Sequence, residues 1–228
     1  MHQYKAWERE YKNPQLVSKD NNPQKDVLRM FKYLKKEEGV IFDSLRVLDL
    51  GCGTGRNSNH LASRGAIVSG LDISDTAIDL AKKRAREEGL QVDYRRFDIG
   101  RAYPYEENQF DLVIDITSSN SLDEAGRTIY LKEVARALKP EGFFLVRALC
   151  KDGDKNAKEL IRKSPGKEHD TYNNKDMRLV ERVFTEKDFK ELYGAYFEIV
   201  SMNKRSGYAR FRNQRYKRNY WLVVMKKK

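Results

Sequence analysis

Short apolar runs alternate with amphipathic segments along this chain of 228 residues, and the alternation predicts an α/β fold. Continuous apolar runs such as 46–50 and 110–116 are typical of strands that are covered on both faces. The predicted strands cover residues 46–50, 66–72, 91–98, 110–116, 143–149, 197–203 and 220–225.

Helical spacing of apolar residues predicts a helix between most of these strands. Asn22 followed by Pro23 is typical of a helix start, and Gly39 ends the apolar stripe that follows. Four more helices are predicted. One covers about 55–64, one begins after a cap at Ser74, and one carries the apolar stripe 130–138. The last begins at a capping box of Thr185 with Asp188.

This order of elements predicts a doubly wound, Rossmann-like sheet of seven strands, mostly parallel, with an antiparallel C-terminal strand. The whole chain, 1–228, is interpreted as one domain. Its parts are an N-terminal helical cover (1–39), a ligand-binding core (40–150), a polar and irregular insertion on the substrate side (151–182), and a final helix with two strands (183–228).

Composition narrows the class of protein. No apolar run approaches the roughly 20 residues of a membrane helix, and the first residues lack the apolar core of a signal peptide. Cys52 and Cys150 are the only cysteines, too few for a disulfide framework or a cysteine zinc site. We therefore expect a cytoplasmic protein with no metal and no membrane contact.

Three glycines follow the first predicted strand in "VLDLGCGTGR", residues 47–56. Gly51, Gly53 and Gly55 allow a sharp strand-to-helix turn, and the missing side chains let a ligand approach the backbone. A dinucleotide fingerprint requires glycine at position 56, where this chain has Arg56. Asp49 adds negative charge, so the loop suits a cationic or zwitterionic ligand better than a pyrophosphate.

The chain resembles the class I S-adenosylmethionine-dependent methyltransferases. "VLDLGCGTG" and "GLDIS" are similar to the first two motifs of that family, and "RFDI", "FDLVID" and "LKPEGFFLV" follow in the family's order. Residues 55–74 are especially similar to the tellurite-resistance and thiopurine-type branch, which acts on small molecules. The resemblance is strong over about 40–150.

The resemblance implies S-adenosylmethionine as cofactor and a set of residues that bind it. Gly51 and Gly53 would lie against the methionine part, with Asp49 near its ammonium group. Asp72 would accept hydrogen bonds from both ribose hydroxyls, since one carboxylate offers two acceptor oxygens. The complete implied set is Asp49, Gly51, Gly53, Asp72, Ile73 on the adenine face, Asp98 and Ile99 at the adenine edge, and Asp115 between cofactor and acceptor.

Acceptor-side residues are less clearly marked. Trp7 and Tyr11 look like the aromatic segment that covers the cofactor in the small-molecule branch, although core packing explains them equally well. His169 and Tyr172 lie in the insertion, where such enzymes build acceptor pockets, and Glu181 shares that segment. We take Asp115, His169 and Tyr172 as candidate catalytic residues. Tyr11, His169 and Asn120 of "TSSNS" are candidate substrate-binding residues.

The acceptor itself is predicted to be a small molecule, with nucleic acid as the alternative. The chain lacks the "NPPY" or "DPPY" run associated with nucleobase amino groups, and no proline precedes Cys150. A third interpretation is a domain that binds the cofactor without catalysis. The identity of the acceptor, the methylated atom and the oligomeric state stay open.

The C-terminal segment carries almost all of the excess charge of +11. Residues 204–228 contain ten Lys and Arg and no acid, and aromatic residues interleave with them at Tyr208, Phe211, Tyr216, Tyr220 and Trp221. Three interpretations stay open: a basic loop that joins the last two strands, a nucleic-acid surface, or a cationic rim for an anionic small substrate.

Overall fold

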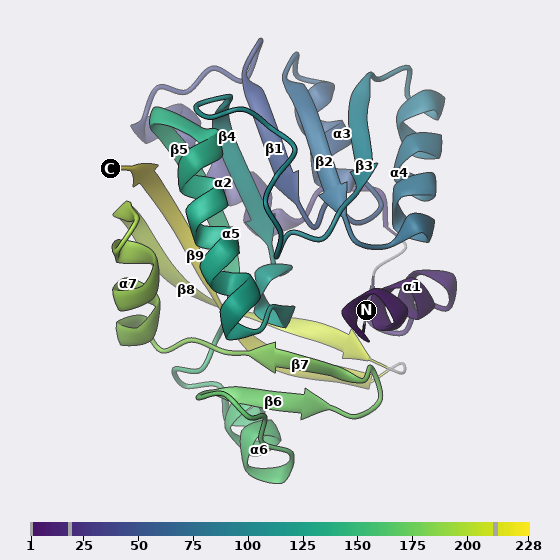
Figure 1. Cartoon of the computed structure of the whole chain (residues 1–228), viewed down its shortest axis with the longest axis vertical. Coiled ribbons are helices and arrows are strands. Elements are labelled where there is room, and N and C mark those ends of the chain that lie inside the picture. Colours follow the sequence, from purple (N-terminus) through teal and green to yellow (C-terminus); the bar gives the residue numbers. More distant parts are fainter. Residues whose placement is uncertain (1, 18–19, 212–213) are drawn as a thin grey trace.

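A seven-stranded sheet forms the centre of the computed structural model, which describes residues 2–17, 20–211 and 214–228 (Figure 1). Its strand order is β3-β2-β1-β4-β5-β9-β8. Strands β1 to β5 are parallel, and β9 runs antiparallel to both β5 and β8, which confirms the predicted fold. The strands are β1 (Arg46–Leu50), β2 (Ile67–Asp72), β3 (Val92–Arg96), β4 (Phe110–Ile116), β5 (Leu138–Cys150), β8 (Phe197–Phe211) and β9 (Gln214–Lys227).

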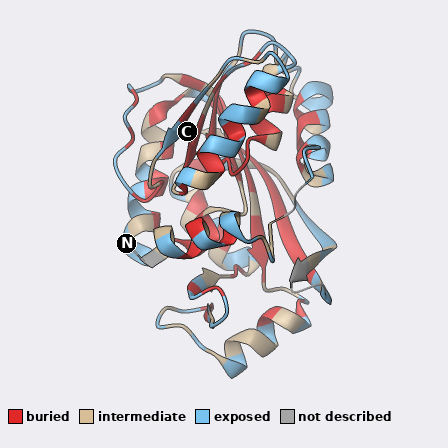
Figure 2. Ribbon diagram, turned by 90° about the vertical axis from the view of Figure 1, so that its right-hand side faces the viewer, coloured by how far each residue is buried: buried red, intermediate tan, exposed pale blue. Residues whose placement is uncertain are grey.

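Helices cover both faces of this sheet, which explains the continuous apolar strands. Leu48 of β1 packs with residues of α5 (Glu124–Ala137) and α7 (Glu186–Gly194). Its neighbour Val47 packs on the opposite face with residues of α2 (Lys25–Glu37) and α3 (Arg56–Ala62). The buried strands and helix faces form a continuous interior in Figure 2. Two further elements are α4 (Asp75–Glu87), beside β2 and β3, and the short 3₁₀ helix η1 (Ser119–Ser121).

Three predicted helix starts test the sequence interpretation. The hydroxyl of Ser74 accepts a hydrogen bond from Ala77 N, and that of Thr185 accepts one from Asp188 N, so both predicted caps are confirmed. The predicted start at Asn22 is wrong, because α2 begins at Lys25. The backbone and side-chain nitrogens of Asn22 instead donate to Asp20, which makes a local turn before the helix.

The insertion is more regular than its polar sequence predicts. It contains α6 (Lys155–Lys163) and a separate two-stranded antiparallel sheet of β6 (Thr171–Asn174) and β7 (Leu179–Arg182). Together with the N-terminal helix α1 (His2–Lys12), this small sheet lies beyond the carboxyl ends of the parallel strands (Figure 1). The insertion, predicted to be irregular, is therefore an ordered unit that lies next to the carboxyl ends of the parallel strands, where sheets of this class bind ligands.

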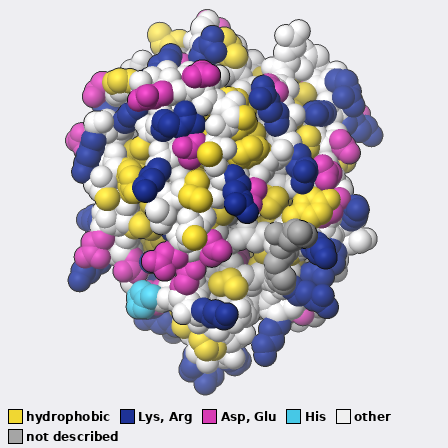
Figure 3. All heavy atoms as spheres, in the orientation of Figure 1, with side chains coloured by type: hydrophobic (Ala, Val, Ile, Leu, Met, Phe, Trp, Pro, Cys, Tyr) yellow, Lys and Arg dark blue, Asp and Glu magenta, His cyan; other side chains and the backbone are white. Residues whose placement is uncertain are grey.

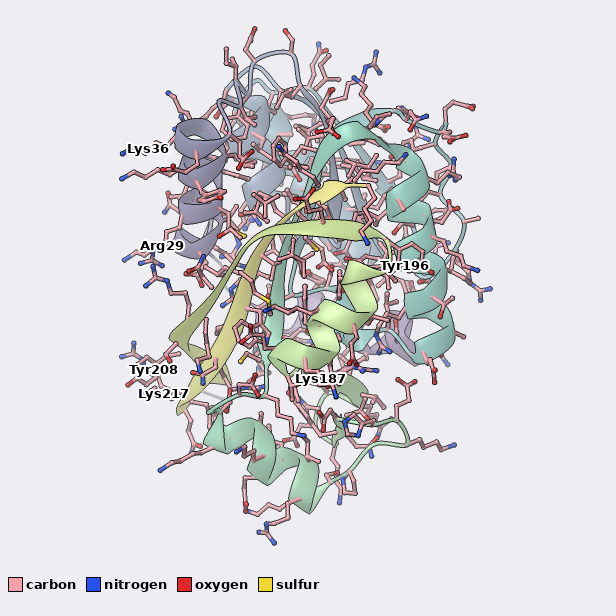
Figure 4. The ribbon with its side chains drawn as sticks, turned by 90° about the vertical axis from the view of Figure 1, so that its left-hand side faces the viewer. Arg29, Lys36, Lys187, Tyr196, Tyr208 and Lys217 are labelled. Carbon is pink, nitrogen blue, oxygen red and sulfur yellow. The ribbon has the colours of Figure 1, made fainter. Side chains whose placement is uncertain are left out.

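The basic C-terminal segment is a hairpin of two long strands, so the first of its three interpretations, a loop between two short strands, is wrong. Strands β8 and β9 pair from Phe197 with Lys227 to Phe211 with Gln214, with one register shift between Ile199 and Ser201, whereas β9 leaves β5 at the pair Cys150 and Asn219. The far part of the hairpin therefore projects past the sheet, and Tyr208 and Lys217 lie near its outer end (Figure 4). The side chain of Phe211 lies outside what the structure describes. No helix within the described ranges is long and apolar enough to cross a bilayer.

Candidate functional site

A cavity of about 1000 Å³ lies at the carboxyl edge of the parallel strands. Three parts of the chain outside the core enclose it: α1, the insertion and the projecting hairpin. Ten residues that the sequence analysis placed on the cofactor or acceptor side line it: Trp7, Tyr11, Gly51, Gly53, Asp72, Ile73, Asp98, Ile99, Tyr172 and Glu181. The cavity therefore collects residues that are distant in sequence at the edge where doubly wound sheets bind ligands.

The glycine loop after β1 forms one wall of this cavity. Gly51, Gly53 and Gly55 have φ values of +69°, +56° and +81°, a region that other residues rarely adopt. A Cβ atom at Gly53 would lie 2.7 Å from the hydroxyl oxygen of Tyr11. Both the turn and the close approach of α1 thus require glycine at this position.

Asp72, at the end of β2, is fixed beside this loop. One carboxylate oxygen accepts a 2.9 Å hydrogen bond from Gly53 N, and the other accepts one of the same length from Ser74 N. The residue is 5% exposed, and burial raises the pKa of its carboxyl group to about 6. Asp72 therefore connects the loop after β1 to the loop after β2 and presents a carboxylate to the cavity.

The loop after β3 supplies the next part of the wall. Asp98 accepts a 2.9 Å hydrogen bond from Gly100 N, and its side chain is 40% exposed. Ile73 and Ile99 line the cavity with it. The combination is two apolar side chains and one accessible carboxylate, which suits a flat ring that carries an amino group.

Helix α1 is attached to the core by Glu8, a residue that the sequence did not single out. Its carboxylate accepts hydrogen bonds from the hydroxyls of Ser74 and Thr76 and from Thr76 N. Burial acts to raise the pKa of Glu8, but these hydrogen bonds outweigh it and lower the value to about 2. The ionised carboxylate at the start of α4 holds Tyr11 and Trp7 over the cavity.

Two of the expected carboxylates lie beneath the cavity rather than in its lining. Asp49 is 1% exposed and accepts a 2.6 Å hydrogen bond from the Ser58 hydroxyl, and burial raises its pKa to about 7. Asp115 is fully buried and accepts hydrogen bonds from Ser119 N and the Tyr130 hydroxyl. In this arrangement both carboxylates brace the loops from inside.

The insertion and the hairpin meet at Tyr172. Its hydroxyl donates a 2.9 Å hydrogen bond to Glu181 of β7 and accepts one of 3.2 Å from Nη1 of Arg218 on β9. Arg218 is also paired with Asp154, at 3.2 Å. Burial is the main cause that raises the pKa of the Tyr172 hydroxyl, so this group stays protonated. Tyr172, Glu181 and Arg218 all line the cavity.

Arg147 of β5 is a second functional candidate that the sequence analysis did not identify. Its guanidinium lies 3.5 Å from the ring centroid of Tyr220, donates to the Thr117 hydroxyl over 2.7 Å and pairs with Asp26 at 3.2 Å. The signal for it was one cation inside the apolar run "FFLVRAL". Arg147, Thr117 and Tyr220 line the cavity on the side toward β9.

His169 and Asn120 are not brought to the cavity. His169 has a side chain that is 73% exposed, and its ring contacts Asp170. Asn120 is 1% exposed, and its side-chain oxygen accepts a 3.0 Å hydrogen bond from Leu149 N. Neither belongs to the cavity lining. Asn120 instead ties η1 to the end of β5.

The family model of a methyltransferase domain matches residues 47–142, which contain the glycine loop, Asp72 and Asp98. This segment of the chain is therefore similar to the methyltransferase domains that the model describes. One curated relative is a ubiquinone biosynthesis O-methyltransferase of Bartonella tribocorum, 33% identical over 108 residues. The match covers 47% of this chain and 42% of the relative, so the chain matches less than half of the relative's length.

Solved structures extend the likeness of this chain to the whole fold. A 1,6-didemethyltoxoflavin N1-methyltransferase of Burkholderia thailandensis, solved with its substrate and S-adenosylhomocysteine, superposes with a TM-score of 0.73. It is 20% identical, and the superposition covers 98% of this chain and 86% of that one. The TehB protein of Haemophilus influenzae gives a TM-score of 0.65 at 21% identity, covering 90% of this chain and 63% of TehB.

Proposed function

We propose that this protein transfers a methyl group from S-adenosylmethionine to a small-molecule acceptor. The observation that carries the proposal is one cavity that is shared by the glycine loop with Asp72 and by a wall of aromatic and guanidinium side chains. Methyl transfer requires cofactor and acceptor in one enclosure, because the reacting atoms must approach in line.

The residues beside the glycine loop fit the cofactor. The bare backbone at Gly51 and Gly53 leaves room for the methionine part, and the carboxylate of Asp72 is placed for the ribose hydroxyls. Ile73 and Ile99 would contact the adenine, with Asp98 accepting from its amino group. Asp49 would act through the loop that it supports, and Asp115 through η1, rather than by direct contact.

The acceptor is proposed to be planar and to carry an anionic group. Alternate residues of β9, Tyr216, Arg218 and Tyr220, line the cavity, and Tyr172 and Arg147 complete this wall. The Nη2 atom of Arg218 is buried without a hydrogen-bond partner among the described residues, and a carboxylate would satisfy it. This arrangement supports the interpretation of the basic segment as a cationic rim.

A nucleic-acid acceptor is less well supported. Arg215 and Lys217 alternate with the cavity-lining residues of β9 and are exposed outside the cavity. On the face of the molecule that Figure 3 shows, Lys and Arg side chains are interspersed with acidic ones. We therefore assign the hairpin to acceptor enclosure.

The chain's own residues orient the acceptor and exclude water. S-adenosylmethionine supplies an already activated methyl group, so alignment and desolvation can provide roughly 7–11 kcal/mol of the lowering of the barrier. For an acceptor that carries a proton on the reacting atom, Glu181 is a carboxylate on the acceptor side that can take it. The hydrogen bond from Tyr172 holds that carboxylate in place.

Two measurements test the proposed function. Calorimetry with S-adenosylhomocysteine should show saturable binding to one site per chain. Aromatic acids and their uncharged amides should then be screened as acceptors, with release of S-adenosylhomocysteine as the readout. We expect turnover with the acids. The variant Arg147→Gln should reduce this turnover, whereas the surface control Arg95→Gln should not. Binding without turnover of any acceptor supports a non-catalytic domain, and absence of binding overturns the proposal.

A further inference from the structure

Three side chains of the types that bind metal ions lie together where the insertion meets α7. His169 and Asp170 immediately precede β6, and Asp188 lies in the first turn of α7. One imidazole nitrogen and one oxygen from each carboxylate all lie within 4.8 Å of one another. The cluster is separate from the cavity, since none of the three residues lines it.

Two carboxylate oxygens of this cluster accept no hydrogen bond from residues 2–17, 20–211 or 214–228. Asp170 is 7% exposed, and its Oδ1 is paired with Lys151, but its Oδ2 has no hydrogen-bond partner in the part of the chain that the structure describes. Oδ2 of Asp188 is likewise buried without a partner among the described residues. Buried carboxylate oxygens that lack a donor are costly, and a cation between them removes that cost.

The imidazole completes the ligand set without competing for these oxygens. Nε2 of His169 lies 3.3 Å from Oδ2 of Asp170, yet this oxygen accepts no hydrogen bond, so the imidazole does not donate to it. Two ligands of a tetrahedral zinc ion, each bound at 2.0–2.1 Å, lie about 3.3 Å apart. The two atoms therefore have the separation of neighbouring ligands.

The surrounding contacts hold the cluster in this geometry. Successive residues of a strand point to opposite faces, but Asp170 has a φ of +53°, and this left-handed backbone lets His169 and Asp170 reach the same point. Glu168, next to them, is paired with the buried Arg127 of α5 at 3.3 Å. Lys151 occupies one oxygen of Asp170 and leaves Oδ2 as the available ligand atom.

We propose that His169, Asp170 and Asp188 form a site for a divalent transition-metal ion of the zinc type. One nitrogen and two carboxylate oxygens suit such an ion, and the exposed His169 leaves its fourth position open to water. A bound ion fastens the segment before β6 to α7. Because Tyr172 follows Asp170 by two residues, the ion also stabilises the acceptor wall of the cavity.

Calorimetric titration of the chelator-treated full chain with Zn²⁺ tests the site. We expect one ion per chain, and a loss of affinity of at least about tenfold in both Asp188→Asn and His169→Ala, since even outer-shell substitutions cost that much. Glu191→Gln is the matched control, because Glu191 is an exposed acid on the same helix, paired with Lys187 outside the cluster. It should bind Zn²⁺ as the unsubstituted protein does.

Thermal unfolding gives a second measurement that does not depend on activity. Zn²⁺ should raise the melting temperature of the unsubstituted protein and of Glu191→Gln, but not that of Asp188→Asn. Unchanged secondary structure in the variants excludes misfolding as the cause. The proposal is overturned if Zn²⁺ does not bind saturably. It is also overturned if Asp188→Asn and His169→Ala both bind Zn²⁺ with an affinity within twofold of that of the unsubstituted protein.

Discussion

The carboxylate of Asp72 accepts a hydrogen bond of 2.9 Å from the backbone nitrogen of Gly53. This contact joins the end of β2 to the loop after β1, across 19 positions of the sequence. It sets the carboxylate beside the part of the loop that has no side chains. One interaction thus places the two groups that the proposed cofactor needs, a bare backbone and a paired acceptor for a diol.

Substitution of Asp72 should show its role in binding. We expect Asp72→Ala to weaken the affinity for S-adenosylhomocysteine at least about tenfold, the scale of losing charge-assisted hydrogen bonds. Isothermal calorimetry measures the change. Asp93→Asn, an exposed carboxylate of the neighbouring strand, should leave the affinity unchanged. Equal affinity of Asp72→Ala and the unsubstituted protein would remove Asp72 from the site.

The pH dependence of binding should report the same carboxylate. Burial raises the pKa of Asp72 to about 6, so the group becomes neutral as the pH falls through that value. A neutral carboxyl group is a weaker acceptor for ribose hydroxyls, and the affinity for S-adenosylhomocysteine should fall from pH 7 to pH 5. Calorimetry over this range should give a slope for the unsubstituted protein and none for Asp72→Asn. A parallel slope in both proteins contradicts the assignment.

Gly53 allows backbone strain and steric contact to be separated. Gly53→Ala should destabilise the protein more than Gly89→Ala. A Cβ at Gly53 would lie 2.7 Å from the Tyr11 hydroxyl oxygen, whereas a Cβ at Gly89 would have no heavy atom of the described residues within 4 Å, its chain neighbours aside. Both residues have positive φ, so each substitution costs about 1 kcal/mol for the left-handed backbone. Denaturant unfolding measures the difference. Adding Tyr11→Phe should restore part of the loss at Gly53 and none at Gly89.

Asp49 should lower stability at neutral pH. Burial raises its pKa in the folded protein to about 7 from the ordinary 3.8, so the folded chain keeps a proton that the unfolded chain has released between these values. The contribution of Asp49 to stability therefore falls as the pH rises from about 4 to about 7, by at most ~4 kcal/mol. Asp49→Asn should be more stable than the unsubstituted protein at pH 8, with a smaller difference at pH 5, in urea unfolding. A difference that does not change with pH would contradict this origin.

Local patterns were sufficient where function depends on consecutive residues. The glycine spacing of 51, 53 and 55 indicates a turn with positive φ wherever it occurs, and an acid that ends a buried strand indicates the ligand edge. The same reasoning could not assign Asp115, because position at a strand end does not say whether a side chain faces the cavity or the core. Burial and the hydrogen bond from Tyr130 decided that.

The hairpin shows why the sequence could not predict the residues on the acceptor side of the cavity. Polar and aromatic residues interleave in 203–221, and such a segment suits a loop as well as a strand until a partner strand is known. Pairing of β8 with β9 fixed which residues face inward and so brought Arg218 to Tyr172, 46 positions away.

The sequence alone determined the strands of the main sheet, the sheet class and the glycine turn that is proposed to receive the cofactor, because these follow from periodicity and from the backbone freedom of neighbouring residues. Only the tertiary structure decided the acceptor wall and the cluster of His169, Asp170 and Asp188. Contacts between distant segments depend on how strands pair and helices pack, and no local pattern encodes which side chains then meet.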